Sequence, residues 1–214
     1  MERNMAVLIA DLSGYTALTE THGASAAADL IDKYVEMVEN SLVGDSYFHE
    51  RTGDEVMIVS PSADHLLATA SNLLQNSSAE NNFLQLHGGL HFGKILNRNN
   101  HYFGTTLNLA ARIAKKANPG SFWCSREYLH ALHRATPFTF QSKGKQDFKN
   151  ISEIHEVYEL ISGNHTDFYI DPVCKMQIDH KKIAVPHPNR SNIFFCHQGC
   201  LDTYLQYHLN LRWS

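Results

Sequence analysis

Short apolar runs alternate with longer segments of helical spacing along the first third of the chain. The unbroken apolar run at residues 5–11 predicts a fully buried strand. Apolar side chains then recur every three or four positions over residues 24–42 and again over residues 63–76, which predicts two helices. Between the helices, residues 46–60 are typical of a hairpin that turns around Gly53.

Residues 83–161 continue these patterns. In chain order the predicted elements are strands at about 83–92 and 94–98 split by Gly93, a polar loop over 99–104, a third helix over 105–117, a strand at 121–124, a short helix from 126, and strands near 137–142 and 154–161. The order begins βαββα and continues with further strands and helices, so it predicts one mixed α/β domain.

The last fifth of the chain differs in character from the rest. Residues 168–214 follow a polar stretch at Gly163, are rich in aromatic side chains and carry three of the four cysteines. A segment of about 45 residues does not easily stabilise its own core without a metal or docking. We therefore predict an α/β domain over residues 1–163 and a small cysteine module over residues 164–214, with the boundary near 163–167.

The composition and charge of the 214 residues fit a globular protein that does not bind nucleic acid or an anionic membrane. The net charge is −4 and no long basic run is present, which argues against nucleic acid and anionic membranes as partners. No apolar stretch approaches the roughly 20 residues that a membrane helix needs. The N-terminus runs straight into the first strand, unlike a signal peptide. We expect a cytoplasmic protein.

Two aspartates stand at predicted strand ends beside glycines. Asp11 ends the first apolar run shortly before Gly14, and Asp54 follows Gly53 in the hairpin turn. Side chains at such ends stand clear of a sheet, and backbone N–H groups there can face a phosphate. Two carboxylates brought together would hold Mg²⁺ or Mn²⁺ along with a substrate phosphate. The alternative is that each aspartate only caps its turn.

Two further polar side chains share one face of the predicted third helix. Asn108 and Arg112 are four residues apart, so they project in the same direction. A carboxamide and a guanidinium placed there could hold a ribose and a triphosphate oxygen. The alternative is an ordinary solvated helix face.

These residues belong to four stretches that occur together in a known family. The stretches are Asp11-Leu12-Ser13-Gly14-Tyr15-Thr16, Thr52-Gly53-Asp54-Glu55-Val56-Met57, Gly88-Gly89-Leu90-His91-Phe92-Gly93 and Tyr102-Phe103-Gly104 through Arg112. In this order, and continued by Asn118-Pro119-Gly120, they resemble the catalytic domain of class III adenylate and guanylate cyclases over about residues 4–162. The resemblance implies a ferredoxin-like α/β fold and a lyase that converts a nucleoside triphosphate to a 3′,5′-cyclic nucleotide and pyrophosphate.

The resemblance also implies a head-to-tail homodimer with the active site at its interface. Asp11 and Asp54 match the two metal-binding aspartates, which would hold two Mg²⁺ or Mn²⁺ ions. Asn108 and Arg112 match the residues that orient the ribose and stabilise the transition state, and they would come from the partner chain. The loop from Leu12 to Thr16 would cradle the triphosphate through backbone N–H groups.

The family has a lysine for the terminal phosphates of the nucleotide. Lys143, in Ser142-Lys143-Gly144-Lys145, stands at this position, and a shift of register would make it Lys145. A lysine there would stabilise the charge that develops on the phosphates during the transfer.

Two positions that read the purine in the family depart from its patterns. In the family that this chain resembles, adenylate cyclases have a lysine and an aspartate or threonine at these positions, and guanylate cyclases have a glutamate and a cysteine. This chain has Glu50 and His101 there. A carboxylate at Glu50 can accept from guanine N1–H and the 2-amino group, or from the 6-amino group of adenine. His101 can donate or accept. ATP is the expected substrate of a bacterial-looking domain, Glu50 favours GTP, and a pyrimidine triphosphate stays open.

Two cysteine-bearing stretches stand out in the C-terminal segment. They are Asp171-Pro172-Val173-Cys174-Lys175-Met176 and Phe194-Phe195-Cys196-His197-Gln198-Gly199-Cys200. Over about residues 168–210 they resemble a YHS domain, a small treble-clef-like module associated with metal-handling proteins, with departures at Lys175 and His197. Three thiolates and a fourth ligand from His197 or another histidine would suit Zn²⁺ or Cu(I).

Other interpretations of these features remain. The three C-terminal thiols would otherwise be reduced and packed in a small hydrophobic unit, and Cys124 is expected in a buried strand. For the whole chain, the sequence favours a homodimeric nucleotidyl cyclase whose output the C-terminal module regulates. The alternative is a catalytically degenerate domain that senses a nucleotide or a metal and signals to a partner.

Overall fold

The computed structural model describes residues 2–133, 136–161, 168–179 and 184–210, so the predicted domain boundary near 163–167 lies outside the described residues. The main body contains β1 (Glu2–Leu12), α1 (Tyr15–Ser41), β2 (Tyr47–Thr52), β3 (Glu55–Ser60), α2 (Ala63–Ala79), β4 (Leu86–Arg98), β5 (His101–Phe103), α3 (Thr105–Lys116), β6 (Ser121–Ser125), α4 (Arg126–Ala131), β7 (Thr139–Gln146) and β8 (His155–Ile161).

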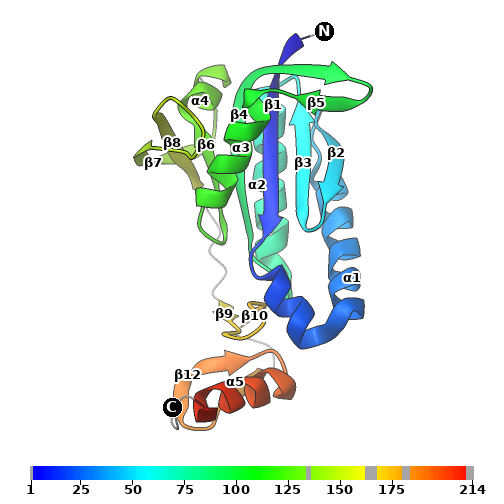
Figure 1. Ribbon diagram of the computed structural model, residues 1–214, viewed down its shortest axis with the longest axis vertical. Helices are drawn as coiled ribbons and strands as arrows, with labels where there is room; N and C mark the ends of the chain where they lie inside the picture. Colours follow the sequence, from blue (N-terminus) through cyan, green and yellow to red (C-terminus); the bar gives the residue numbers. More distant parts are fainter. Residues whose placement is uncertain (1, 134–135, 162–167, 180–183, 211–214) are drawn as a thin grey trace.

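The strands of the main body form one sheet in the order β2-β3-β1-β4-β6-β8-β7, and β5 pairs with β4 as a hairpin. β1 lies antiparallel to both of its neighbours, whereas β4 and β6 are parallel. The predicted α/β fold is confirmed, and it places the ends of β1 and β3 next to one another (Figure 1).

The sheet is covered on both faces because the side chains of β1 alternate between them. Ala6, Leu8 and Ala10 pack with apolar residues of α1 and α2, while Val7 and Ile9 pack with residues of α3. In Figure 1, α3 lies in front of the sheet and α2 behind it. None of the helices in the described ranges is long and apolar enough to cross a membrane.

Two elements differ from the sequence expectations. The first helix begins at Tyr15, not near residue 24, and Gly23 with φ 83° makes a kink inside it. The strands predicted on either side of Gly93 are the single strand β4. Gly93 does not turn the chain: a Cβ at this position would lie 2.7 Å from Thr106 Oγ1, so the glycine allows α3 to pack closely. Part of the predicted polar loop is the short strand β5.

The C-terminal elements are β9 (Phe168–Ile170), β10 (Gln177–Asp179), β11 (Val185–His187), β12 (Arg190–Phe195) and α5 (Gln198–Asn210). They form two small hairpins and a helix at one end of the main body (Figure 1). Gln177 fastens this segment to the main body: its N–H donates to Phe83 O at 2.8 Å, and its Nε2 donates to Ser77 O at 2.8 Å. The cysteine segment is therefore docked on the α/β domain.

A buried histidine in β4 predicts how stability depends on pH. Burial lowers the pKa of His91 from 6.5 to about 4, and its Nδ1 lies 2.7 Å from Ser125 Oγ. Because the unfolded chain binds this proton more tightly, the free energy of unfolding should fall as the pH drops from 6.5 to about 4. His91 alone should account for a fall of about 3 kcal/mol in the free energy of unfolding.

Urea unfolding measures this effect. Across this pH range, the free energy of unfolding of His91→Gln should decrease less than that of the unmodified protein. His130→Gln, at an exposed position of α4, is the matched control and should keep the original dependence. Equal pH dependence in all three proteins would contradict the assignment to His91.

Candidate active site

The structure brings the two predicted metal ligands together. Ala10 of β1 pairs with Val56 of β3, which leaves Asp11 and Asp54 beside one another at the same end of the sheet. Burial raises the pKa of Asp11. Burial and the neighbouring charge of Asp11 raise the pKa of Asp54 to about 6. The two carboxylates therefore lie close enough to influence each other's pKa.

The donor set of this pair fits a hard divalent cation. Leu12 N–H donates to Asp11 Oδ1 at 3.0 Å, and His87 Nε2 lies 3.8 Å from Asp11 Oδ2. Among the described residues, no lysine or arginine forms an ion pair with Asp11 or Asp54. Two half-buried carboxylates that repel one another, without a cationic side chain between them, suit Mg²⁺ or Mn²⁺ as oxygen ligands.

His87 is a neighbour of this pair that sequence reasoning missed. It pairs with Asp11 across the β1–β4 ladder, and its Nδ1 lies 3.1 Å from Ser13 Oγ. Burial lowers the pKa of His87, which favours the neutral ring. Its position before Gly88 gave no signal by itself, because only the register of the two strands places it opposite Asp11.

The predicted triphosphate loop lies between β1 and the start of α1. Gly14 caps the helix with φ 96°, a left-handed conformation that glycine adopts readily. Ser13 N–H donates a hydrogen bond to Gln85 O at 2.8 Å, which fixes the position of the loop beside β4. The first turn of a helix leaves backbone N–H groups without intrahelical partners, and these groups attract anions. The loop from Leu12 to Thr16 therefore leads into backbone N–H groups of this kind.

Asn108 and Arg112 share one face of α3, as predicted. Gly89 permits the close packing of this helix on β4, since a Cβ there would lie 2.2 Å from Ala110 O. Asn108 is exposed and Arg112 is partly buried. Among the described residues, neither side chain forms a hydrogen bond or an ion pair with Asp11 or Asp54. Within one chain, the two predicted halves of the site are not joined.

The two candidate base-reading residues lie on neighbouring segments. Glu50 of β2 is exposed and lines a cavity of about 160 Å³ together with Asn108 of α3. His101 is exposed on β5, next to Tyr102, whose ring lies 4.5 Å from that of His49 in β2. No hydrogen bond or ion pair between described residues joins Glu50 to His101.

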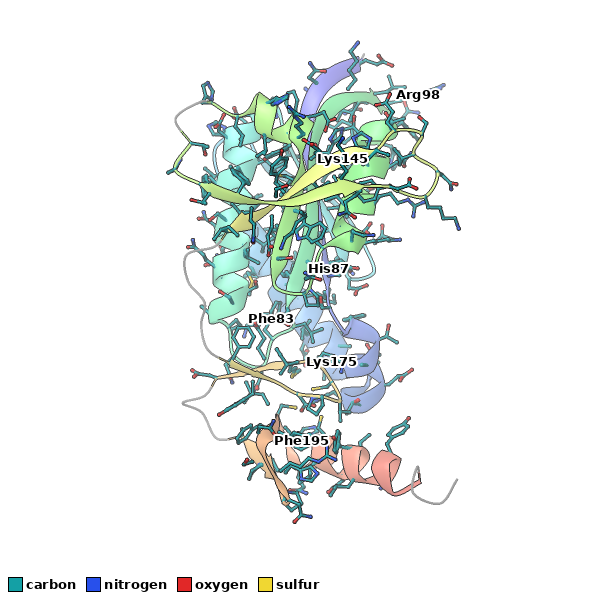
Figure 2. All side chains as sticks on the ribbon, turned by 90° about the vertical axis from the view of Figure 1, so that its left-hand side faces the viewer. Phe83, His87, Arg98, Lys145, Lys175 and Phe195 are labelled. Atoms are coloured by element: carbon teal, nitrogen blue, oxygen red, sulfur yellow. The ribbon has the colours of Figure 1, made fainter. Side chains whose placement is uncertain are left out.

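The candidate phosphate lysines lie on β7, away from the two aspartates. Lys143 forms an ion pair with Glu159 of β8 and lies 5.7 Å from the centre of the Trp123 ring. Lys145 is exposed, and Figure 2 shows it at the opposite end of the main body from Lys175, with His87 between them. Neither lysine reaches Asp11 within this chain.

The three C-terminal cysteines meet in one cluster, and a histidine from the main body joins them. Cys174, Cys196, Cys200 and His22 present ligand atoms that all lie within 4.8 Å of one another. His197 is not in this group, and its Nδ1 accepts a hydrogen bond from Cys200 N at 3.1 Å. Cys124 is buried in the core of the main body, as expected for a strand residue.

Comparison with known proteins gives consistent neighbours for the main body. No protein-family model matches the chain. A pH-sensitive adenylate cyclase of Mycobacterium tuberculosis is 29% identical over 152 residues, which cover 70% of this chain and 38% of that protein. A Trypanosoma brucei adenylate cyclase structure, described in its monomeric state, superposes with a TM-score of 0.70 at 18% identity over 84% of this chain and 95% of its own.

A second solved structure is the guanylate cyclase domain of Catenaria anguillulae in complex with GTP, with a TM-score of 0.63 and 17% identity. It covers 76% of this chain and 98% of its own. The chain spans less than half the length of the curated relatives that it matches. The chain is a homologue of the class III adenylate and guanylate cyclases, and its main body has the fold of their catalytic domain.

Proposed function

We propose that two copies of this chain form a nucleotidyl cyclase that converts a nucleoside triphosphate to a 3′,5′-cyclic nucleotide and pyrophosphate. The observation that carries the proposal is the pairing of Asp11 and Asp54 at adjoining strand ends beside the Gly14 loop. The sequence relatives that are named adenylate cyclases support it.

In the proposed reaction, the ribose 3′-oxygen attacks the α-phosphorus. A new phosphorus–oxygen bond closes the ring, the bond to the β-phosphate oxygen breaks, pyrophosphate leaves, and the 3′-hydroxyl proton passes to water. Asp11 and Asp54 would hold Mg²⁺ or Mn²⁺, proposed as two ions per site. These ions, when bound, lower the pKa of the hydroxyl and neutralise charge on the attacking and leaving oxygens. The backbone N–H groups of the Gly14 loop bind phosphate oxygens.

The second copy supplies the groups that one chain lacks at this position. Asn108 of the second copy would orient the ribose, and its Arg112 would stabilise charge on the phosphates in the transition state. Lys143, or Lys145 in the other register, would act on the terminal phosphates. Among the described residues, neither Asn108 nor Arg112 forms a hydrogen bond or an ion pair with the aspartates of its own chain, which favours this shared arrangement.

The cavity between β2, β3 and α3 is the proposed site for the base edge. Glu50 and Asn108 line it together, so one chain would supply both the base-reading carboxylate and the ribose-orienting amide. A carboxylate in this position accepts hydrogen bonds from amino groups of a base. ATP and GTP are both candidates, and His101 on the neighbouring hairpin would face the same base.

Exchange of the base-reading charge should change the choice of nucleotide. In Glu50→Lys, the rate with GTP should fall relative to the rate with ATP by on the order of 10²-fold, because the acceptor for the guanine amino groups is lost. Relative kcat/KM values for the two nucleotides measure this. Glu36→Lys on the exposed face of α1 is the matched control. An unchanged ratio in Glu50→Lys would exclude this residue as a reader of the base.

The direct test of the proposed function is product formation from each of the four nucleoside triphosphates with Mn²⁺. We expect one or two of them to yield a cyclic nucleotide and an equal amount of pyrophosphate. If the purified dimer binds a nucleotide but forms no cyclic product from any of the four, the degenerate sensor domain becomes the better description.

For the C-terminal segment, we propose a YHS-like metal-binding module that regulates the cyclase. The meeting of Cys174, Cys196 and Cys200 in one cluster supports a soft metal, either Zn²⁺ or Cu(I).

A further inference from the structure

The cysteine cluster takes its ligand atoms from three separate parts of the chain. Cys174 lies between β9 and β10, Cys196 directly follows β12, Cys200 lies in the first turn of α5, and His22 belongs to α1 of the main body. The Sγ atoms of Cys174 and Cys196 are 3.5 Å apart, and those of Cys196 and Cys200 are 3.6 Å apart. His22 Nε2 lies 3.7 Å from Cys196 Sγ and 3.6 Å from Cys200 Sγ.

These separations match the edges of a tetrahedron around zinc. With zinc–sulfur bonds of about 2.3 Å and zinc–nitrogen bonds of about 2.0–2.1 Å, two sulfurs should lie about 3.8 Å apart and sulfur and nitrogen about 3.6 Å apart. A disulfide would bring two sulfurs to about 2.05 Å, and all four cysteines are free thiols. The arrangement therefore fits metal coordination better than oxidation.

A buried carboxylate holds the cysteine backbones in place. Asp171 is fully buried, and its Oδ1 accepts from Val173 N at 2.8 Å and Cys174 N at 3.2 Å. Its Oδ2 accepts from Cys196 N at 2.8 Å. One side chain thus fixes both cysteine-bearing turns, as outer-shell groups do in metal sites. Packing of reduced thiols alone would not need this arrangement.

We propose that His22 and the three cysteines form a Zn²⁺ site that ties the C-terminal segment to the main body. An imidazole among thiolates in a tetrahedron favours Zn²⁺ over Cu(I). The His197 ring packs against that of His22 at a tilt of 33°, with centroids 4.5 Å apart, and supports it without being a ligand. The fourth ligand therefore comes from the cyclase-like domain, so the metal fastens two parts of the chain that are distant in sequence.

The site adjoins the proposed triphosphate loop from two sides. His22 ends the short helical stretch that begins at Tyr15 and is interrupted at Gly23. Lys175, next to Cys174, packs on Gly14 so closely that a Cβ on Gly14 would lie 2.6 Å from its Cβ. Lys175 has φ 67°, a conformation unusual for lysine. Bound Zn²⁺ therefore orders the Gly14 loop, and the effect of this order on nucleotide binding rests on the proposed cyclase function.

Metal content and a cobalt spectrum test the site without any measurement of activity. The full chain should bind one Zn²⁺, and Co²⁺ in its place should give the absorption of a tetrahedral thiolate site. His22→Ala should weaken Zn²⁺ binding at least about tenfold, since even outer-shell changes cost 10–100-fold. His22→Cys should keep Zn²⁺ and shift the cobalt spectrum toward four sulfurs. His197→Ala is the matched control and should retain Zn²⁺.

Two results would overturn the ligand assignment. Unchanged zinc affinity and cobalt spectrum in His22→Ala would remove His22, and loss of zinc in His197→Ala together with its retention in His22→Ala would make His197 the ligand. Circular dichroism of His22→Ala shows whether its loss of zinc reflects misfolding. His22→Cys, which offers a ligand at the same position, should bind zinc and keep the original circular dichroism spectrum.

The link to the Gly14 loop has its own measurement. With zinc present, His22→Ala should raise KM for the nucleotide at least about fivefold, and His22→Cys should restore it. A variant that has lost zinc but keeps the original KM would refute this link while leaving the metal site in place. Failure of the unmodified chain to make any cyclic nucleotide would refute the cyclase function, and the zinc measurements would be unaffected.

Discussion

Asp54→Asn is expected to reduce cyclic nucleotide formation by on the order of 10³-fold or more, and Asp11→Asn by a similar factor. Each amide keeps the shape of the carboxylate but removes the charge that holds the divalent ions and, through them, the developing charge of the transition state. Initial rates at saturating nucleotide, with Mn²⁺ varied over a wide range, measure the loss. Excess Mn²⁺ should restore little activity.

The same variants should not lose stability, which separates a catalytic effect from misfolding. Burial raises the pKa values of both aspartates, and the charge of Asp11 raises the pKa of Asp54 further, so the metal-free fold carries an unfavourable pair of like charges. Neutralising Asp54 should therefore leave the Tm of the metal-free protein unchanged or higher. Asp29→Asn on the exposed face of α1 is the matched control for both readouts. Normal turnover in Asp54→Asn would contradict the assignment of this residue as a metal ligand.

The fold was predictable to the extent that hydrophobic periodicity determined it. Long periodic segments such as α2 and α3 were found close to their observed ends. The first turns of α1 were missed because residues 15–22 bury only Leu18 completely and carry no apolar stripe. The sequence pattern predicts a break between strands at Gly93, whereas the glycine allows the close approach of Thr106. Tertiary packing, which the local pattern does not contain, decided both cases.

The candidate sites divide in the same way. Asp11 and Asp54 could be predicted because a short strand, a glycine and a carboxylate form a local signal. His22 gave no such signal: it stands in a polar stretch and meets the cysteines only after the C-terminal segment docks. His87 likewise depends on the register between β1 and β4. A residue that acts through long-range contacts can be found only from the structure. A residue type in a local sequence pattern, such as an aspartate beside a glycine at a strand end, can be found from the sequence.

Mixing two inactive variants should restore activity if the site is shared between two chains. Asp54→Ala lacks one metal ligand, and Arg112→Ala lacks the proposed transition-state cation of the other half. In a head-to-tail pair of the two variants, one site carries both defects and the other carries none. After full subunit exchange, half of the dimers are mixed and half of their sites are intact, so about a quarter of the original activity should return.

A mixture of Asp11→Ala and Asp54→Ala is the matched control for this experiment. Both defects then fall in the half-site that holds the metal, so every site in every dimer lacks one carboxylate and the mixture should stay inactive. Subunit exchange is verified with two differently tagged chains, so that a silent mixture cannot be attributed to separate homodimers. If the Asp54→Ala and Arg112→Ala mixture remains as inactive as its parents after proven exchange, the two residues do not meet across an interface. The α3 face of the same chain would then have to reach the aspartates by a rearrangement of α3 relative to β1 and β3.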